Sequence, residues 1–133
     1  MLEEFILLLA IATEKRKVSN TIMNCLTIQI FNYEFLGPIK LSEWGPPMEE
    51  VVYALFSRAK DAFNMIYIGE SDKTENADFF TKNEKFKCWV AHAGSYDSLY
   101  LSIYPMWKSQ KEEREKIVKK TIARYKPICN MEI

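Results

Sequence analysis

The sequence has few of the residues from which protein metal sites are usually built. It contains one histidine, His92, and three widely spaced cysteines, Cys25, Cys88 and Cys129, with no Cys-x-x-Cys pair. These residues do not match a Cys/His zinc site of the usual spacing. We therefore expect no metal site from them, a packed or solvent-facing histidine, and reduced, mostly buried thiols in a cytoplasmic protein.

The chain also lacks a net charge. Its 133 residues include 18 basic and 18 acidic side chains, which cancel at pH 7. A neutral protein has no overall field that attracts nucleic acid, so binding to DNA would need a local basic patch. The content of 48% hydrophobic and 27% charged residues is typical of a globular protein.

No apolar run long enough for a membrane-spanning helix stands at the start of the chain. The apolar segment 5–12 is shorter than the roughly 20 residues needed, and glutamates rather than basic residues precede it. We interpret this segment as a packing helix that could mediate self-association, and we expect no membrane partner. Met1 and Met23 both remain possible translation starts.

The pattern of residue types predicts an α+β fold, in which helices flank a small mixed or antiparallel sheet. Good helix formers without glycine or proline predict a helix over residues 2–17. We expect Gly37-Pro38 to end the first strand. The second and third strands are joined by a short connection, which favours an antiparallel hairpin. Strands are predicted by β-branched and aromatic residues over Leu26–Phe35, Val51–Phe56, Met65–Ile68 and Leu99–Tyr104.

The C-terminal third is predicted to be helical apart from the last strand. Short helices are expected around Ala77–Phe80 and Phe86–Ala91. The capping-box pattern Ser109-Gln-Lys-Glu112 predicts the start of a longer helix that runs to about Tyr125. Its apolar face is predicted to consist of Ile117, Val118, Thr121, Ile122 and Tyr125, and Pro127 follows its end.

Several segments of the predicted hairpin and helix are arranged as in a known family. Val51-Val52-Tyr53 and Tyr67-Ile68-Gly69 lie in the two hairpin strands, and Trp44-Gly-Pro-Pro47 precedes the first. The last helix ends in Tyr125-Lys-Pro127, followed by Asn130. In this order the segments resemble the GIY-YIG nuclease superfamily over residues 44–130. The resemblance implies a GIY-YIG-like domain at 44–133 and, before it, an extension at 1–43 that packs a helix and a strand on the core.

The resemblance also implies which residues would form a nuclease site. The family uses two tyrosines on neighbouring strands, an arginine that binds phosphate and a glutamate that holds a divalent metal. Tyr53 and Tyr67 match the tyrosines, but no arginine occurs between Arg58 and Arg114. Val118 stands where the resemblance places the glutamate, and an aliphatic side chain cannot bind magnesium. We therefore expect a catalytically degenerate member that needs no cofactor, with both tyrosines as remnants of the site.

Two other interpretations of these residues stay open. Tyrosine is common in strands, and rings on paired strands pack against each other without any catalytic role. Alternatively, an active DNA endonuclease would need Mg²⁺ or Mn²⁺ on a relocated carboxylate, for which Glu115, Glu70 and Asp72 are the candidates.

The last helix carries a local excess of positive charge. Residues 107–126 include eight basic and three acidic side chains. Such a run is often a solvated helix face, but it also suits a surface that follows the phosphates of a nucleic acid. Lys116, Lys120 and Arg114 are the candidate phosphate contacts, and Trp107 is a candidate for stacking on bases.

The function expected from these observations is a nucleic-acid-binding or DNA-processing accessory role for a GIY-YIG-like domain without catalysis. DNA is the expected partner. A metal-dependent endonuclease is one alternative. The other is a protein-interaction or structural domain with no nucleic-acid role, in which the N-terminal helix makes the contact.

Overall fold

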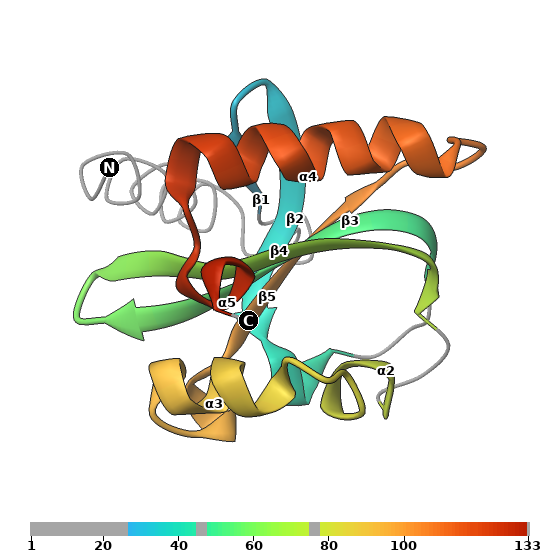
Figure 1. The fold of residues 1–133 in the computed structure, drawn as a ribbon. Helices are drawn as coiled ribbons and strands as arrows, with labels where there is room; N and C mark the ends of the chain where they lie inside the picture. The colour runs from blue at the N-terminus through green and yellow to red at the C-terminus, as the bar shows by residue number, and fades with distance from the viewer. Residues whose placement is uncertain (1–26, 45–47, 75–77, 133) are drawn as a thin grey trace, which may run out of the picture.

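A computed structural model describes residues 27–44, 48–74 and 78–132 of the protein. In this part of the chain, one five-stranded antiparallel sheet is flanked by four α-helices (Figure 1). The α+β prediction is confirmed, and the sheet is antiparallel rather than mixed. The strands are β1 (Thr27–Ile30), β2 (Tyr33–Lys40), β3 (Met48–Ala59), β4 (Ala62–Thr74) and β5 (Tyr100–Pro105), in the order β1-β2-β5-β3-β4. The helices are α2 (Asp78–Thr81), α3 (Phe86–Ala93), α4 (Lys111–Tyr125) and α5 (Ile128–Met131), with 3-10 turns at Leu41–Glu43 and Tyr96–Ser98.

The hairpin of β3 and β4 is the longest element of the sheet, and it confirms the predicted pair of strands. Its pairing extends from Met48 opposite Thr74 to Ala59 opposite Ala62, so both strands are longer than predicted. β5 pairs with the other edge of β3. β3 is therefore covered on both edges and both faces, which explains its continuous apolar run.

Alternate residues of β3 face two separate apolar layers. Val52, Ala54 and Phe56 belong to the layer that also contains Ile117 and Tyr125 of α4. Figure 1 shows α4 across this face of the sheet, and α2 and α3 on the other. The layer on the α3 side contains Val51, Tyr53, Leu55, Phe80 and Trp89. The predicted apolar face of the last helix is confirmed, because its residues are buried or packed against the α4-side layer.

The predicted strand over Leu26–Phe35 is wrong, because its described residues form a hairpin. The chain turns at Phe31-Asn32, where Phe31 has φ 57°, and β2 then runs back along β1. Gly37-Pro38 lies inside β2 and does not end it. Gly37 has φ 97°, and the pairing of β2 with β5 shifts register between Leu36 and Ile39. This irregularity accommodates the proline without a ladder hydrogen bond from its nitrogen.

Helix α4 begins differently from the predicted capping box. Gln110 is the N-cap residue, and its backbone N–H donates to Glu113 Oε1 at 2.8 Å. The hydroxyl of Ser109 instead accepts a hydrogen bond from Arg114 Nη1 at 2.8 Å. The predicted capping box of Ser109 and Glu112 is therefore wrong by one residue. Gln110 and Glu113 form the box, and the serine hydroxyl binds a buried arginine instead. The predicted short helices correspond to α2 and α3, and the last strand to β5.

The described part of the predicted extension 1–43 belongs to the same sheet as the hairpin. β2 pairs with β5 along Leu36–Ile103 and Lys40–Tyr100. The predicted boundary near residue 44, between the extension and the GIY-YIG-like domain, stays a prediction. The helix predicted over residues 2–17, its role in self-association and Cys25 fall outside the described residues. Among the residues described, no helix is both long enough and apolar enough to cross a membrane.

Candidate functional site

The two motif tyrosines lie on neighbouring strands, where they form part of an aromatic cluster. The Tyr53 ring on β3 lies 6.1 Å from the Tyr67 ring on β4, and it is only 2% exposed. Phe80 packs edge-on against Tyr53 at 5.3 Å, and Trp89 lies 5.2 Å from Tyr67. The rings therefore fill the α3-side layer next to each other, as packing residues do.

Gly69 makes this arrangement possible. It lies directly opposite Tyr53 in the hairpin. A Cβ atom at Gly69 would lie 2.8 Å from Tyr53 Cζ and Oη, and 2.9 Å from Tyr67 Cε2. Both tyrosine rings thus occupy the space that a side chain at position 69 would need, which explains the glycine of the second motif.

The surroundings of the tyrosines keep both phenols protonated. Burial raises the pKa of Tyr53 far above its ordinary value, and the neighbouring Tyr67 phenol and the Glu70 charge add to the increase. The pKa of Tyr67 is also raised, chiefly by burial and further by the charges of Glu84 and Glu70. Burial therefore disfavours ionisation of both phenols.

Val118 lies away from this cluster. It is partly buried on α4 and packs against the α4-side layer, whereas both tyrosines belong to the α3 side. The sheet separates the two. Glu115, the carboxylate nearest in sequence that could replace a glutamate at position 118, lies in a shallow groove on α4 with Glu112 and Lys119. The structure therefore does not bring Glu115 together with Tyr53 and Tyr67 in one cavity.

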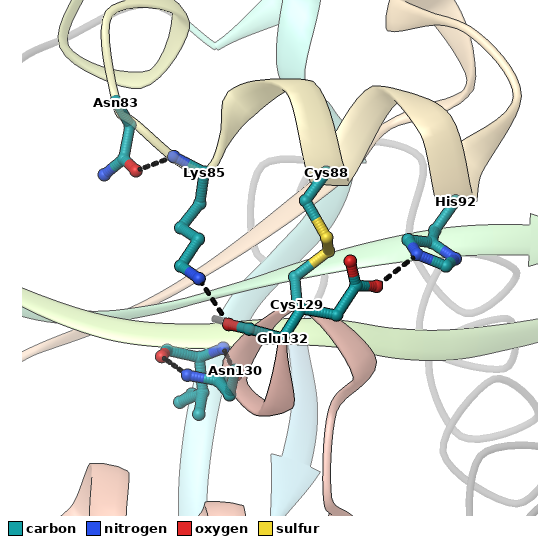
Figure 2. Close-up of a disulfide and its surroundings, with 8 residues drawn as sticks. Asn83, Lys85, Cys88, His92, Cys129, Asn130 and Glu132 are labelled. Atoms are coloured by element: carbon teal, nitrogen blue, oxygen red, sulfur yellow. Dashed lines mark hydrogen bonds and ion pairs between the residues drawn. A yellow bond between two sulfur atoms is a disulfide. The ribbon is translucent and has the colours of Figure 1, made fainter.

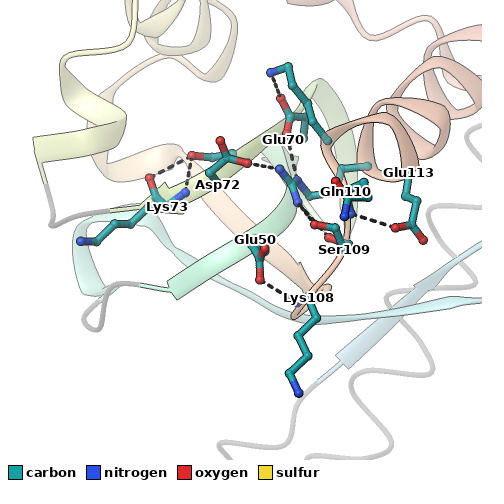
Figure 3. Close-up of polar contacts among 11 residues, drawn as sticks. Glu50, Glu70, Asp72, Lys73, Lys108, Ser109, Gln110 and Glu113 are labelled. Atoms are coloured by element: carbon teal, nitrogen blue, oxygen red, sulfur yellow. Dashed lines mark hydrogen bonds and ion pairs between the residues drawn. The ribbon is translucent and has the colours of Figure 1, made fainter.

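The other two candidate metal ligands, Glu70 and Asp72, bind basic side chains (Figure 3). Arg114 Nε donates to Glu70 Oε1 at 3.0 Å, and Arg114 Nη2 donates to Asp72 Oδ1. Lys111 Nζ donates to the second oxygen of Glu70 at 2.8 Å. Because Arg114 is on α4 and both carboxylates are on β4, these ion pairs attach the helix to the strand.

Arg114 therefore differs from the other predicted nucleic-acid contacts. Its side chain is 1% exposed. Its remaining nitrogen, Nη1, donates hydrogen bonds to the hydroxyl and the main-chain carbonyl of Ser109. A buried guanidinium must have its donors paired, and the fork shape of arginine suits two carboxylates. The structure points this arginine inward, away from any surface ligand.

Lys116 and Lys120 instead line an open groove between α4 and the ends of β2 and β5. This α4 groove has a volume of about 440 Å³, and its other lining residues are Tyr33, Tyr104, Met106, Glu113 and Ile117. Lys120 Nζ lies 4.5 Å from the centre of the Phe31 ring and 5.6 Å from that of Tyr33. Cations and aromatic rings thus share one surface.

The sequence located the lysines of this groove but not its tyrosines. Tyr33 and Tyr104 come from segments 71 residues apart in the sequence, and their rings lie 5.2 Å apart. Only the pairing of β2 with β5 brings them together. In the sequence, only the alternation of side chains along each strand could have indicated which face each tyrosine is on. Trp107, the predicted stacking residue, is 72% exposed and directly follows Met106 of the groove.

The C-terminal segment is attached to the second motif by a side-chain amide. Asn130 Oδ1 accepts from the Ile68 N–H at 2.8 Å, and Asn130 Nδ2 donates to the Ile68 carbonyl at 2.9 Å (Figure 2). The amide therefore pairs with the main chain of β4 as another strand would. This contact places α5 beside the hairpin.

The same segment carries a disulfide. Cys129 on α5 is bonded to Cys88 on α3, with the sulfurs 2.12 Å apart (Figure 2). The prediction of reduced thiols is therefore wrong for this pair. The sequence did not reveal it because the two cysteines are separated by 41 residues, and only the docking of α5 brings them together.

Comparisons of the chain with models of protein families, with curated proteins and with solved structures found no match.

Proposed function

We propose that this protein is a GIY-YIG-like domain that has lost nuclease activity and binds DNA through the α4 groove, as an accessory module in DNA processing. The observation that carries the DNA-binding proposal is the combination of Lys116 and Lys120 with Tyr33 and Tyr104 in one groove. Lysines bind phosphates through charge, while aromatic rings stack on unpaired bases, so the groove suits a single-stranded or branched substrate.

The position of the lysines on α4 supports this proposal. Lys116 and Lys120 are one helical turn apart and both are exposed, so they face the same side of the helix. Glu113 lies one turn before Lys116 and lines the same groove. A phosphate chain would avoid this carboxylate, so we expect the strand to pass over the Lys116–Lys120 end.

Three features support the proposed resemblance to this family. Tyr53 and Tyr67 lie on neighbouring strands, as the resemblance implies. Gly69 accommodates the Tyr53 ring directly across the hairpin. Asn130 of the closing segment is bonded to Ile68 of the second motif. The first motif, the second motif and the closing asparagine thus meet at one place.

Three further features support the loss of catalysis. The phenols of Tyr53 and Tyr67 have raised pKa values because they are buried. The aliphatic Val118 contributes to the α4-side layer where the family has a metal ligand. Glu70 and Asp72 are engaged by Arg114. A metal ion at these carboxylates would have to displace a buried guanidinium, which would lose both of its carboxylate partners.

The binding proposal is tested by fluorescence anisotropy with labelled single-stranded and forked DNA at low salt. The double variant Lys116→Glu/Lys120→Glu is expected to bind at least about tenfold more weakly. Its plot of log K against log salt should be shallower by roughly 1.4 to 1.8, because two phosphate contacts are lost. The matched control is Lys73→Glu/Lys87→Glu, which makes the same charge change at exposed residues outside α4.

Two outcomes would contradict this proposal. One is an equal loss of binding in the control variant, and the other is the absence of wild-type binding at low salt. The loss of nuclease activity is assayed separately, with supercoiled DNA and Mg²⁺ or Mn²⁺. We expect no nicking. Nicking by the wild type that Tyr67→Phe and Glu115→Gln abolish would instead establish an active nuclease with a relocated carboxylate.

A further inference from the structure

Three potential metal ligands meet where α5 docks on α3. Cys88 and His92 lie one turn apart on α3, and Cys129 approaches them from α5 (Figure 2). Their candidate ligand atoms, two sulfurs and one imidazole nitrogen, all lie within 4.8 Å of one another. This cluster is separate from the α4 groove and belongs to the α3 side of the sheet.

Contacts other than the disulfide also hold this cluster together. Asn130 anchors α5 to the main chain of β4 with two hydrogen bonds. Lys85 Nζ donates to the Glu132 carbonyl at 2.7 Å, and Glu132 Oε2 lies 2.8 Å from His92 Nε2. Because these contacts do not involve the S–S bond, we expect Cys129 to stay beside Cys88 and His92 after its cleavage.

We propose that the reduced protein binds one Zn²⁺ ion through Cys88, Cys129 and His92, and that the disulfide is the metal-free, oxidised state of the same site. Two thiolates and one imidazole form a donor set that zinc prefers. Water completes the coordination. The proposal concerns redox and metal binding, and it does not depend on the proposed binding of DNA.

Glu132 is a positioning residue in this proposal. Its carboxylate accepts a hydrogen bond from Nε2–H of His92, so the proposed site assigns the other ring nitrogen, Nδ1, to the metal. A carboxylate on the second nitrogen of a ligating histidine fixes the tautomer and the ring orientation. Because Glu132 is held through its main chain by Lys85, the carboxylate already lies next to the ring before a metal binds.

The geometry requires only a local change. Zn–S bonds of about 2.3 Å at a tetrahedral angle place two sulfurs roughly 3.8 Å apart. The Cα atoms of Cys88 and Cys129 are 5.9 Å apart. Rotation of the two cysteine side chains after reduction can therefore separate the sulfurs without movement of α3 or α5.

The exchange between the two states is a two-electron reaction. A disulfide oxidant such as oxidised glutathione accepts two electrons from the two thiolates, and its own S–S bond breaks to give two thiolates, which take up two protons from water. The Cys88–Cys129 bond forms, and Zn²⁺ leaves. In the reverse direction a phosphine reductant in water becomes the phosphine oxide and leaves two thiols, whose protons are released when zinc binds.

The test uses the full chain in both redox states. The protein is reduced with a phosphine, freed of reductant without air, and titrated with Co²⁺ as a spectroscopic substitute for Zn²⁺. The reduced wild type is expected to bind one equivalent, with thiolate-to-cobalt charge-transfer bands and the d–d bands of tetrahedral cobalt, and Zn²⁺ should remove them. The oxidised protein should show neither the charge-transfer bands nor the d–d bands.

Variants assign the ligands. Cys88→Ser and Cys129→Ser should each lose most of the charge-transfer intensity, whereas Cys25→Ser removes the third cysteine and serves as the matched control. His92→Asn should weaken zinc binding by more than tenfold, and Glu132→Gln should weaken it by about 10- to 100-fold while the charge-transfer bands remain. His92 and Glu132 are exposed, so these variants should fold, and circular dichroism checks each protein.

The proposal is overturned if reduced wild-type protein binds cobalt no better than the Cys88→Ser/Cys129→Ser double variant. It is also overturned if Cys25→Ser loses as much charge-transfer intensity as Cys88→Ser. Neither result depends on DNA, so failure of this proposal and failure of the DNA-binding proposal are distinguishable.

Discussion

The two faces of the sheet differ in whether their polar and aromatic side chains are accessible to a ligand. On the α3 side, the motif residues Tyr53, Tyr67 and Gly69 fit together closely, and the Tyr53 ring is almost fully buried. On the α4 side, lysines and tyrosines line an open groove. The motif tyrosines therefore serve packing, and the residues suited to binding lie on the opposite face.

A similar difference exists within α4 itself. Arg114 and Lys116 are two residues apart, yet the first is buried among carboxylates and the second faces the groove. Positive charge on one helix thus has two uses, to attach the helix to β4 and to present a basic surface. Substitutions on the two faces can show whether this division holds.

The largest effect is expected from Arg114→Ala. It leaves the mostly buried Glu70 without its guanidinium partner, so we expect a loss of about 3 kcal/mol in the free energy of unfolding. Urea denaturation followed by circular dichroism measures this loss. Lys119→Ala, at an exposed position of the same helix, is the control and should change stability by less than about 0.5 kcal/mol. An equally small effect of Arg114→Ala would show that its ion pairs do not stabilise the fold.

Gly69→Ala tests whether the tyrosine pair is packed as closely as a core. The new methyl group would meet Tyr53 Cζ and Oη at 2.8 Å, so we expect destabilisation by roughly 1 to 3 kcal/mol. A double-mutant cycle with Tyr53→Leu should show coupling between the two positions, because the smaller side chain removes the clash with residue 53 and leaves only the contact with Tyr67. Additive effects in this cycle would mean that the ring and position 69 do not compete for space.

The smallest effect concerns the ionisation of the phenols. The folded-state pKa of Tyr53 lies above its unfolded value near 10, so the stability that this group contributes is complete below about pH 10 and decreases as the pH rises further. The contribution is at most about 1.4 kcal/mol per pH unit. Urea midpoints measured from pH 8 to pH 11.5 should decrease less steeply for Tyr53→Phe than for the wild type. Identical slopes would show that the buried phenol ionises as easily as an exposed one.

The sequence predicted the local elements better than the contacts between them. Val51–Phe56 has a strand pattern because both faces of β3 are buried, and Ile117, Thr121 and Tyr125 repeat at helical spacing because one face of α4 packs on the sheet. The prediction over Leu26–Phe35 was wrong since Phe31 is itself suited to a strand and gives no turn signal. Phe31 nevertheless adopts a positive φ in the turn that joins the paired strands β1 and β2.

The candidate sites could be predicted only in part, for the same reason. Lys116 and Lys120 were recognisable because one helix carries them both. The partners of Arg114 were not, because Glu70 and Asp72 lie more than 40 residues away on β4. The candidate ligands Cys88, His92 and Cys129 were rejected because their spacing in the sequence matches no usual zinc motif. That spacing does not limit the site, because the docking of α5 on α3 brings the three residues together.

By itself the sequence determined where β3, β4 and α4 form, that the charge of the chain is balanced, and that position 118 cannot bind a metal ion. These properties depend on residue type and on short-range periodicity. The tertiary structure decided that Tyr53 and Tyr67 lie within an apolar layer, that Arg114 points inward, and that Cys129 reaches Cys88. The reason is that burial and pairing depend on which distant segments meet, and this sheet order brings β5 between β2 and β3 and lets α5 dock on β4.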